Sequence, residues 1–356
     1  MEDDGRYMAI PPGAIIPGAL PQFKIFMLSP QGYYVLWALE GQKVSANQLA
    51  RISGGHIKYV YVDLDDKFKY DEYIESNLGK ILENKTSSVE QKAEIFSQVS
   101  TRVVKGAFES SFGEGVVGPS VLERMERMVK NALVFISETN SLQALTQMIG
   151  HDYKTYEHTT KVLWFTVSFL RENPKIMAIL QPDYMELNER QRMDLLRQCG
   201  VGALLHDIGK AFVAPEILNK NAPLNEVEWE IIKRHPLTSL AMLVDSKIPE
   251  FVKQSISQHH EDWDGGGYPL GLRGYHISIL ARVLRVIDCF DAMTSRRPYK
   301  DPIPPKRALE IMIGTPPVKK SGDDSKANDR DKGMMHCFDE DVLRKFILFL
   351  GKMKLD

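Results

Sequence analysis

Several features that mark common protein classes are missing from this chain of 356 residues. Its 3 cysteines (Cys199, Cys289 and Cys337) are too few and too scattered for a disulfide framework or a zinc finger, as is usual in a reducing compartment. No run of 18 apolar residues occurs, so we expect no insertion into a membrane. The start, Met1–Asp4, is acidic and lacks the basic and apolar segments of a secretory signal, so a cytoplasmic location is expected.

A strong net charge is missing as well. The chain has 45 basic and 47 acidic residues and a formal net charge of −2, so no overall positive field would attract a nucleic-acid polymer. An anionic substrate would have to be met by individual lysines and arginines. With 43% hydrophobic and 26% charged residues, the composition is that of an ordinary globular protein, and the length favours two domains.

The first domain, residues 1–140, is predicted to be a small α/β module that continues into helices. Gln31-Gly32 is typical of a turn between two strands. The elements expected are a hairpin of 24–28 and 33–39, a helix at 46–52, a strand at 58–62 and mainly helix over 67–148. No cluster of metal-ligand residues and no glycine-rich phosphate loop occurs in the sequence before residue 150, so we expect a regulatory or sensory role there.

The second domain, residues 150–356, shows the pattern of successive helices, so the whole chain is predicted to be of the α+β class. Two segments have the character of insertions. Residues 173–191 separate two clear helices, and residues 315–333 are almost all polar or turn-forming, which predicts a mobile loop.

Histidine and aspartate are concentrated in three short segments of this second domain. The first, His259–Pro269, begins with two histidines, has three carboxylates within the next four positions and ends in a glycine run before Tyr-Pro. The others are His206–Lys210 and the stretch from Asp288 to Lys300. Histidine is the commonest metal ligand and aspartate supplies anionic oxygen, so the pattern indicates a metal site.

The candidate ligands continue apolar stripes of predicted helices, so they are expected to face the core. Asn225 and Glu228 form the pattern of a capping box, which predicts the start of the helix that leads to His235. The stripes lead to His206 and Asp207 from 192–205, to His235 from Ile231 and Ile232, to His259 and His260 from Val252 and Ile256, and to Asp288 from Ile277, Ala281 and Leu284.

Each residue taken alone has an ordinary explanation. A single buried histidine is more often a hydrogen-bonded core residue than a ligand. Asp288 could pair with Arg285, and Gly265–Gly267 could be any turn. Taken together, so many buried polar groups without partners would each cost about 1–3 kcal/mol. One or two bound dications would remove that cost, so the metal site is favoured over packing.

These motifs resemble those of the HD-GYP family, the bacterial cyclic di-GMP phosphodiesterases within the HD superfamily of metal-dependent phosphohydrolases. The resemblance implies an all-α HD-type helical bundle. Residues 1–140 are only loosely similar to the α/β regulatory segment that precedes some of these domains. The resemblance covers 150–351 and rests on His206–Lys210, His235-Pro236, His259–Pro269 and Asp288–Lys300.

The resemblance also implies a role for each matching residue. Asp207 would bridge two metal ions, and Lys210, which follows it by about one helical turn, would contact the scissile phosphate. The implied substrate contacts are Lys210, Gly267, Tyr268, Arg297 and Lys300. The implied metal ligands are His158, His206, Asp207, His235, His259, His260 and Asp288.

The implied chemistry is hydrolysis by a metal-bound hydroxide. Two dications about 4 Å apart can lower the pKa of a bridging water, while Lys210 adds positive charge from the other side. Nitrogen-rich ligation suits iron, manganese or zinc better than magnesium, and the resemblance favours iron, with manganese as the alternative. Lys154 stands where some members have a glutamate that binds a third metal, so two metal ions are expected.

The activity implied is the opening of cyclic di-GMP to linear pGpG, and onward to GMP. Two alternatives remain open: a receptor that binds a cyclic dinucleotide with little turnover, and a hydrolase of another cyclic dinucleotide or a (p)ppGpp-like compound. The intact HD pair, Lys210 and Tyr268 favour catalysis over a receptor. Besides the nucleotide, a second copy of the chain or a signalling protein could bind through the N-terminal domain.

Overall fold

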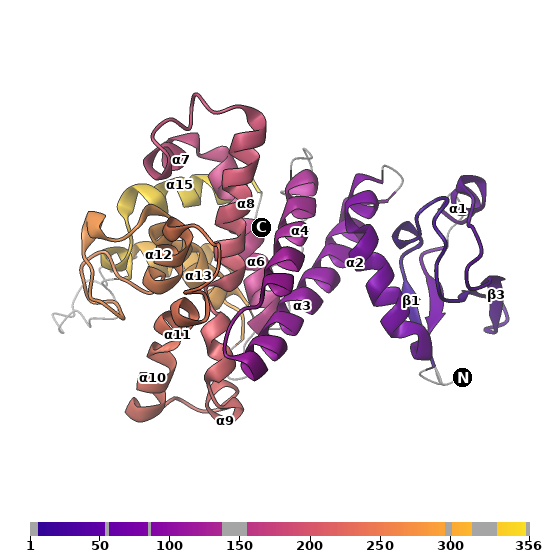
Figure 1. Ribbon diagram of the computed structural model, residues 1–356, viewed down its shortest axis with the longest axis horizontal. Helices are drawn as coiled ribbons and strands as arrows, with labels where there is room; N and C mark the ends of the chain where they lie inside the picture. The colour runs from indigo at the N-terminus through magenta and orange to yellow at the C-terminus, as the bar shows by residue number, and fades with distance from the viewer. Residues whose placement is uncertain are drawn as a thin grey trace, which may run out of the picture. The chain divides into compact units, whose positions relative to one another are not determined.

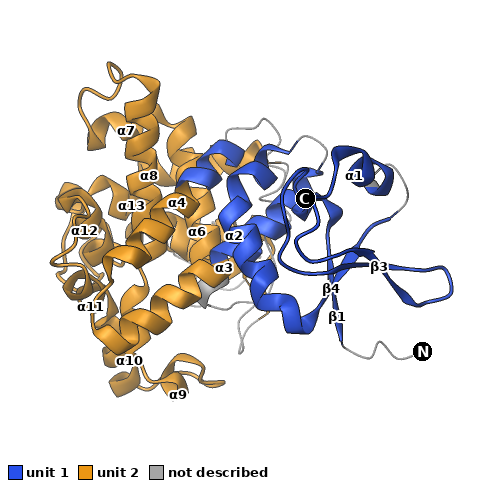
Figure 2. Ribbon diagram, turned by 45° about the vertical axis from the view of Figure 1, so that its right-hand side comes forward, with its two compact units in different colours: residues 1–100, 130–144 blue, residues 101–129, 145–356 orange. Residues whose placement is uncertain are grey.

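The computed structural model describes residues 6–53, 57–84, 87–136, 155–295, 301–314 and 333–353 (Figure 1). The chain divides into two compact units, residues 1–100 with 130–144 and residues 101–129 with 145–356 (Figure 2). The division falls within helix α3 (Val89–Glu114) and within helix α4 (Pro119–Ile136). A small sheet near the N-terminus, followed by helices, confirms the α+β class. The predicted domain boundary between 140 and 150 lies outside the described residues.

The first unit contains a four-stranded sheet in the order β1-β4-β2-β3, in which every pairing is antiparallel. Its strands are β1 Tyr7–Ile10, β2 Ile25–Leu28, β3 Tyr34–Ala38 and β4 Val60–Asp63. The predicted hairpin is confirmed as β2 and β3, and Gly32 between them has a φ of 84°, which favours glycine. Strand β1 is absent from the prediction because its four residues are too few to show a clear alternation.

The sheet and two helices share the core of the first unit. Predicted helix 46–52 is confirmed as α1 (Ala46–Ser53). Helix α2 (Lys67–Glu83) contacts β4 and buries Ile74, Leu78 and Ile81, which recur at helical spacing. The buried side chains of the sheet are Ile10, Ile25, Val60 and Val62. The unit is therefore a folded α/β module.

Helices α3 and α4 confirm the helical pattern predicted for this stretch of the chain. Gly115 has a φ of 73° and follows the end of α3, and Pro119 begins α4. A glycine with positive φ ends a helix readily, and proline suits the first turn of the next one because it has no N–H to satisfy there.

The second unit is helical throughout its described residues, as predicted. Its α-helices after α4 are α6 Thr155–Glu172, α7 Pro174–Leu180, α8 Glu189–Leu205, α9 Pro215–Leu218, α10 Glu226–Lys233, α11 His235–Met242, α12 Glu250–Gln258, α13 Ile279–Thr294, α14 Pro305–Ile313 and α15 Glu340–Gly351. Among the described helices of the whole chain, none is long and apolar enough to cross a membrane.

Two features bring the helices of the second unit close together. Helices α6 and α8 pack against each other, and a Cβ added to Gly200 on α8 would lie 2.9 Å from a methyl group of Leu163 on α6. Helix α13 is buried on nearly all sides, which is typical of a helix at the centre of a bundle. An acid on α13, such as Asp288, is therefore largely shielded from bulk water.

The structure describes one of the two segments that were predicted to be insertions. Residues 173–191 are ordered and contain α7, and the side chain of Asn188 starts α8 through a capping box with Gln191. Residues 315–332 lie outside the described part of the chain, so the predicted loop there stays a prediction.

Candidate metal centre

The candidate centre is built around Asp207, at the point where α8 gives way to a 3-10 turn, η3 (Ile208–Phe212). His206 and Asp207 are both completely buried. A Cβ at Gly209 would lie 2.3 Å from the carbonyl oxygen of His235, so only glycine lets this turn approach α11. Ser239 on α11 fixes the approach, because its hydroxyl donates to the His206 carbonyl and accepts from the Gly209 N–H.

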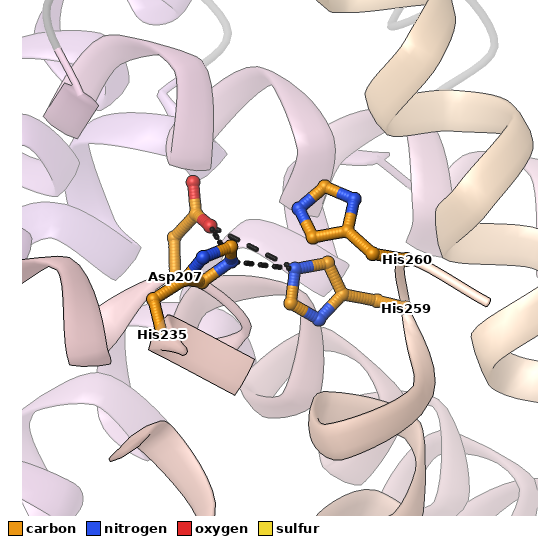
Figure 3. Close-up of side chains that lie close together, drawn as sticks. All are labelled: Asp207, His235, His259 and His260. Atoms are coloured by element: carbon orange, nitrogen blue, oxygen red, sulfur yellow. Dashed lines mark hydrogen bonds and ion pairs between the residues drawn. The ribbon is translucent and has the colours of Figure 1, made fainter. Parts of the chain in front are cut away.

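One group of side chains surrounds Asp207 Oδ1. His235 Nε2 lies 3.1 Å and His259 Nε2 lies 3.8 Å from this oxygen, and the two ring nitrogens are 3.2 Å apart. Dashed lines join these three residues in Figure 3, where His260 lies beside them. We name Asp207, His235, His259 and His260 the second ligand group, because one ligand atom from each lies within 4.8 Å of the others.

A further group lies around the other oxygen of the same carboxylate. Asp207 Oδ2 is 3.4 Å from His206 Nε2 and 3.8 Å from His158 Nε2, and we name these three residues the first ligand group. Asp288 on α13 lies between the two groups: Oδ1 is 3.1 Å from His158 Nε2 and Oδ2 is 3.8 Å from His260 Nδ1. The structure thus brings together all seven residues expected as metal ligands.

The ring orientation of three histidines is set by the backbone. The Nδ1 atoms of His206, His235 and His259 lie 2.7, 2.7 and 2.6 Å from the carbonyl oxygens of Ala203, Ile232 and Ile256 respectively. Because a carbonyl only accepts, each Nδ1 must carry the proton and leave the Nε2 lone pair directed at the centre. Lone pairs that face one another and a carboxylate repel unless a cation lies between them.

The charge states also suit a metal. Burial lowers the pKa of His235, and it lowers the pKa of His259 to about 4, so both rings are neutral near pH 7. Burial acts to raise the pKa of Asp207, but the charge of Lys210 and the adjacent His206 hold that pKa well below its usual range. Neutral imidazole and ionised carboxylate are the forms that bind metals.

Among the buried atoms at the centre, His206 Nε2 and Asp207 Oδ1 have no hydrogen-bond partner in the described part of the chain. A buried polar atom left in this state costs about 1–3 kcal/mol, so native structures rarely keep one without a reason. A dication in each ligand group would satisfy both atoms. The donor set therefore fits a metal centre.

Lys210 lies beside the same carboxylate. Its Nζ is 2.6 Å from Asp207 Oδ2, and its side chain is 14% exposed. The backbone N–H of Lys210 donates to the Asp207 carbonyl, which places the two side chains one turn apart, as expected from their spacing. An ammonium is available at the edge of the centre.

The glycine-rich loop brings Tyr268 to the histidines. A Cβ at Gly267 would lie 2.2 Å from the Asp262 nitrogen and 2.5 Å from the His260 carbonyl oxygen, so this position requires glycine. Tyr268 stacks on His260 with ring centroids 4.8 Å apart and an interplanar angle of 29°. Trp229 on α10, which is 44% exposed, meets Tyr268 edge to face at 6.1 Å.

The acids that follow His260 in the sequence are structural. Glu261 is buried and accepts hydrogen bonds from the Leu270 and Leu272 N–H groups, which closes the glycine loop. Asp262 pairs with Arg285 at 2.8 Å, and Asp264 accepts from the Gly266 N–H. None of these carboxylates belongs to either ligand group.

One residue at the centre was not predicted from the sequence, and three predicted residues lie outside the part of the chain that the structure describes. Asp291 Oδ2 lies 2.7 Å from His158 Nδ1, and the available signal was its place three positions after Asp288 on the same helix. Arg297, Lys300 and Lys154 lie outside the described residues, so the expectations for them stay predictions.

Comparison with known proteins agrees with this geometry. Residues 172–315 match the family model described as an HD domain. The cyclic di-GMP phosphodiesterase PA4108 of Pseudomonas aeruginosa is 37% identical over 162 residues, which are 45% of this chain and 35% of that protein. The cyclic di-GMP phosphodiesterase of Thermotoga maritima is 35% identical over 160 residues, which are 44% of this chain and 39% of that protein.

Other relatives extend the comparison in substrate and in fold. The 3'3'-cGAMP-specific phosphodiesterase 3 of Vibrio cholerae is 39% identical over 110 residues, 31% of this chain and 24% of that protein. The chain thus spans well under half the length of these curated relatives. The solved structure of Bd1817, an HDG"Y"P protein from Bdellovibrio bacteriovorus, shares the fold with a TM-score of 0.58 at 15% identity, over 97% of this chain and 99% of that one. The helical part of this chain, with its two histidine groups and glycine loop, is therefore similar to HD domains and to curated cyclic dinucleotide phosphodiesterases, and it shares its fold with an HDG"Y"P protein.

Proposed function

We propose that this protein is a metal-dependent phosphodiesterase that hydrolyses cyclic di-GMP to linear pGpG, with GMP as the further product. The observation that supports this most is the position of Asp207, whose two carboxylate oxygens face two separate groups of histidines. A carboxylate in that position can be shared by two cations. The relatives named as cyclic di-GMP phosphodiesterases supply the substrate class.

The proposed cofactor is a pair of divalent ions, iron by preference and manganese as the alternative. Nitrogen-rich ligation with one shared carboxylate suits these metals better than magnesium or calcium. When bound, two such ions would lower the pKa of a water and take up negative charge on the phosphoryl oxygens. His206, His235 and His259 would hold the ions through Nε2, since each of them binds a backbone carbonyl through Nδ1.

The remaining residues act on the substrate. Lys210 would turn its ammonium from Asp207 to the scissile phosphate, where its charge stabilises the transition state more than the ground state. Tyr268 and the exposed Trp229 would offer flat aromatic surfaces to a guanine base. Gly267 and the two cations expected further along, Arg297 and Lys300, would complete the contacts to the nucleotide.

A second candidate substrate is favoured by the comparison. Relatives 38–40% identical to this chain over about 110 residues are named as 3'3'-cGAMP-specific phosphodiesterases. The two cyclic dinucleotides differ in one base and share the phosphodiester ring. The centre around Asp207 would hydrolyse both nucleotides. The preference for one of them would depend on the aromatic side chains of Tyr268 and Trp229 and on the glycine-rich loop.

The test is anaerobic metal analysis of the full chain, paired with chromatography of products from cyclic di-GMP and from 3'3'-cGAMP. We expect two ions per chain and conversion of cyclic di-GMP to pGpG. Faster conversion of 3'3'-cGAMP than of cyclic di-GMP would make 3'3'-cGAMP the assigned substrate. Tight binding of either nucleotide with no product from a fully loaded protein would reject the enzyme in favour of a receptor.

A further inference from the structure

His158 is oriented differently from the other histidines of the centre. Three of those histidines place Nδ1 against a backbone carbonyl, whereas Nδ1 of His158 lies 2.7 Å from a carboxylate oxygen of Asp291. Both residues are 1% exposed. The opposite nitrogen of the ring, Nε2, lies 3.1 Å from Asp288. Helix α13 therefore supplies one acid to each nitrogen of His158.

Asp291 is itself supported by a row of buried polar side chains. Ser295 Oγ donates to Asp291 Oδ1 at 3.1 Å, and Lys161 Nζ donates to Ser295 Oγ at 2.9 Å. Lys161 stands three positions after His158 on α6 and is 3% exposed, although lysine is almost never buried without compensation. A single hydroxyl separates its ammonium from the Asp291 carboxylate, so the two charges compensate each other. We name these residues the Lys161–Ser295–Asp291 row.

The two ligand groups consequently differ in charge. The first group shares Asp207 and has Asp288 at 3.1 Å from His158; Asp291 lies behind that histidine, where Lys161 compensates its charge. The second group shares Asp207 and otherwise consists of three imidazoles, with Asp288 no nearer than 3.8 Å to His260. A dication is attracted more strongly where more negative charge is close and water is excluded.

We infer that the Lys161–Ser295–Asp291 row positions His158 and makes the first ligand group the tighter of two metal positions. The carboxylate of Asp291 fixes the proton on Nδ1, directs the Nε2 lone pair at the ion and raises the basicity of the ring. The row keeps Asp291 in place from behind. The inference rests on the metal-dependent part of the proposed function and is independent of which nucleotide is the substrate.

The test is a Co²⁺ titration of the full-length protein after treatment with a chelator, followed by visible absorption in the presence of a competing chelator. Two binding steps are expected. His158→Gln should remove the tighter step and His235→Gln the weaker one, which assigns each step to a ligand group. Asp291→Asn should weaken the tighter step by about 10–100-fold and leave the weaker step unchanged.

A matched control is Asp339→Asn, which alters another buried acid that pairs with Arg282 at 2.7 Å outside both ligand groups. It should leave both steps unchanged. If Asp291→Asn does not fold, Ser295→Ala removes only the supporting hydroxyl and should weaken the same step. A variant of the row that weakens the step assigned to His235, or neither step, overturns the inference.

The Lys161→Met variant distinguishes a role of the row in positioning His158 from a direct effect of the lysine charge on the metal ion. Removing a positive charge near a dication would by itself tighten metal binding. Loss of the row should instead weaken the tighter step. Thermal unfolding is followed in parallel, because removing one partner of a buried charge pair also lowers stability. If the tighter step is strengthened or unchanged in Lys161→Met, the row does not position His158. Absence of any Co²⁺ step in the unsubstituted protein overturns the metal centre, and this inference with it, whereas two normal steps without nucleotide turnover reject only the proposed activity.

Discussion

At the scale of single residues, the centre depends on one carboxylate that serves two groups of histidines. Asp207 is completely buried, and its oxygens lie 3.1 Å from His235 Nε2 and 3.4 Å from His206 Nε2. Removing it would leave neutral imidazoles without the charge that holds a dication in either group. Both ligand groups should therefore lose their metal ions together.

We expect Asp207→Ala to lose bound metal and phosphodiesterase activity in parallel. Metal analysis of the purified variant and product chromatography measure the two losses. Asp264→Ala is the control, because Asp264 is an acid of the neighbouring loop that is 40% exposed and outside both ligand groups. Full metal content with near-normal turnover in Asp207→Ala would reject the shared carboxylate.

Lys210 should affect catalysis without affecting metal binding. An ammonium repels dications, so Lys210→Ala is expected to keep its metal and its fold while kcat for cyclic di-GMP falls by about 10²-fold. Lys253→Ala, which removes a lysine that donates to the Val244 carbonyl outside the centre, should leave kcat unchanged. Metal loss equal to the loss of activity, or an unchanged kcat, would assign Lys210 a structural role.

Most residues of the centre could be predicted from the sequence because their burial follows from helical periodicity. His206, His235 and Asp288 continue apolar stripes, and all three are buried. Periodicity says which face a residue lies on and nothing about its partner. For that reason the partners of Glu261, Asp262 and Asp264 could not be predicted from the sequence, and Asp291 was not predicted as a residue of the centre.

At the scale of elements, the loop after α12 is held by close backbone approach. Gly267→Ala would force a methyl group to within 2.2 Å of the Asp262 nitrogen, which a backbone neighbour cannot avoid. We expect thermal unfolding to show a loss of about 1–3 kcal/mol, the usual cost of overpacking, together with a raised KM because Tyr268 moves. At Gly266 the nearest atom to an added Cβ would be a side-chain oxygen of Asp264 at 3.2 Å, so Gly266→Ala should have far smaller effects.

Short elements were the least predictable part of the fold. The hairpin β2–β3 could be predicted from its turn glycine, and the capping box at Asn225 marks where α10 begins. The capping box at Asn188, which begins α8, was not predicted. Strand β1 has four residues and acquires its conformation by pairing with β4, fifty or more positions away. Pairing over that distance leaves no local signal in the sequence.

At the scale of the whole molecule, the histidines link metal content to stability against acid. Burial lowers the pKa of His259 to about 4, below the value of about 6.5 in an unfolded chain, so the unfolded protein binds more protons between these pH values. The metal-free protein should therefore lose stability as the pH falls from about 7 towards 4.

Urea denaturation of chelator-treated protein at pH 7 and pH 5 measures this loss. His259→Gln should reduce the difference between the two pH values. His336→Gln changes a histidine whose side chain is 59% exposed and should leave that difference unchanged. Equal stability of the unsubstituted protein at both pH values would contradict the burial of neutral histidines.

The residues gathered around Asp207 come from five separate segments of the chain between His158 and Asp288. An ion held by them would act as a cross-link that closes several long chain segments at once, and closing such segments restricts the unfolded chain. Since occupancy stabilises the folded state by mass action, the lifetime of the helical unit would follow the free metal concentration. A protease that cuts only the opened chain would then degrade this protein fastest where the metal is scarce, so its abundance would report metal supply independently of its catalysis.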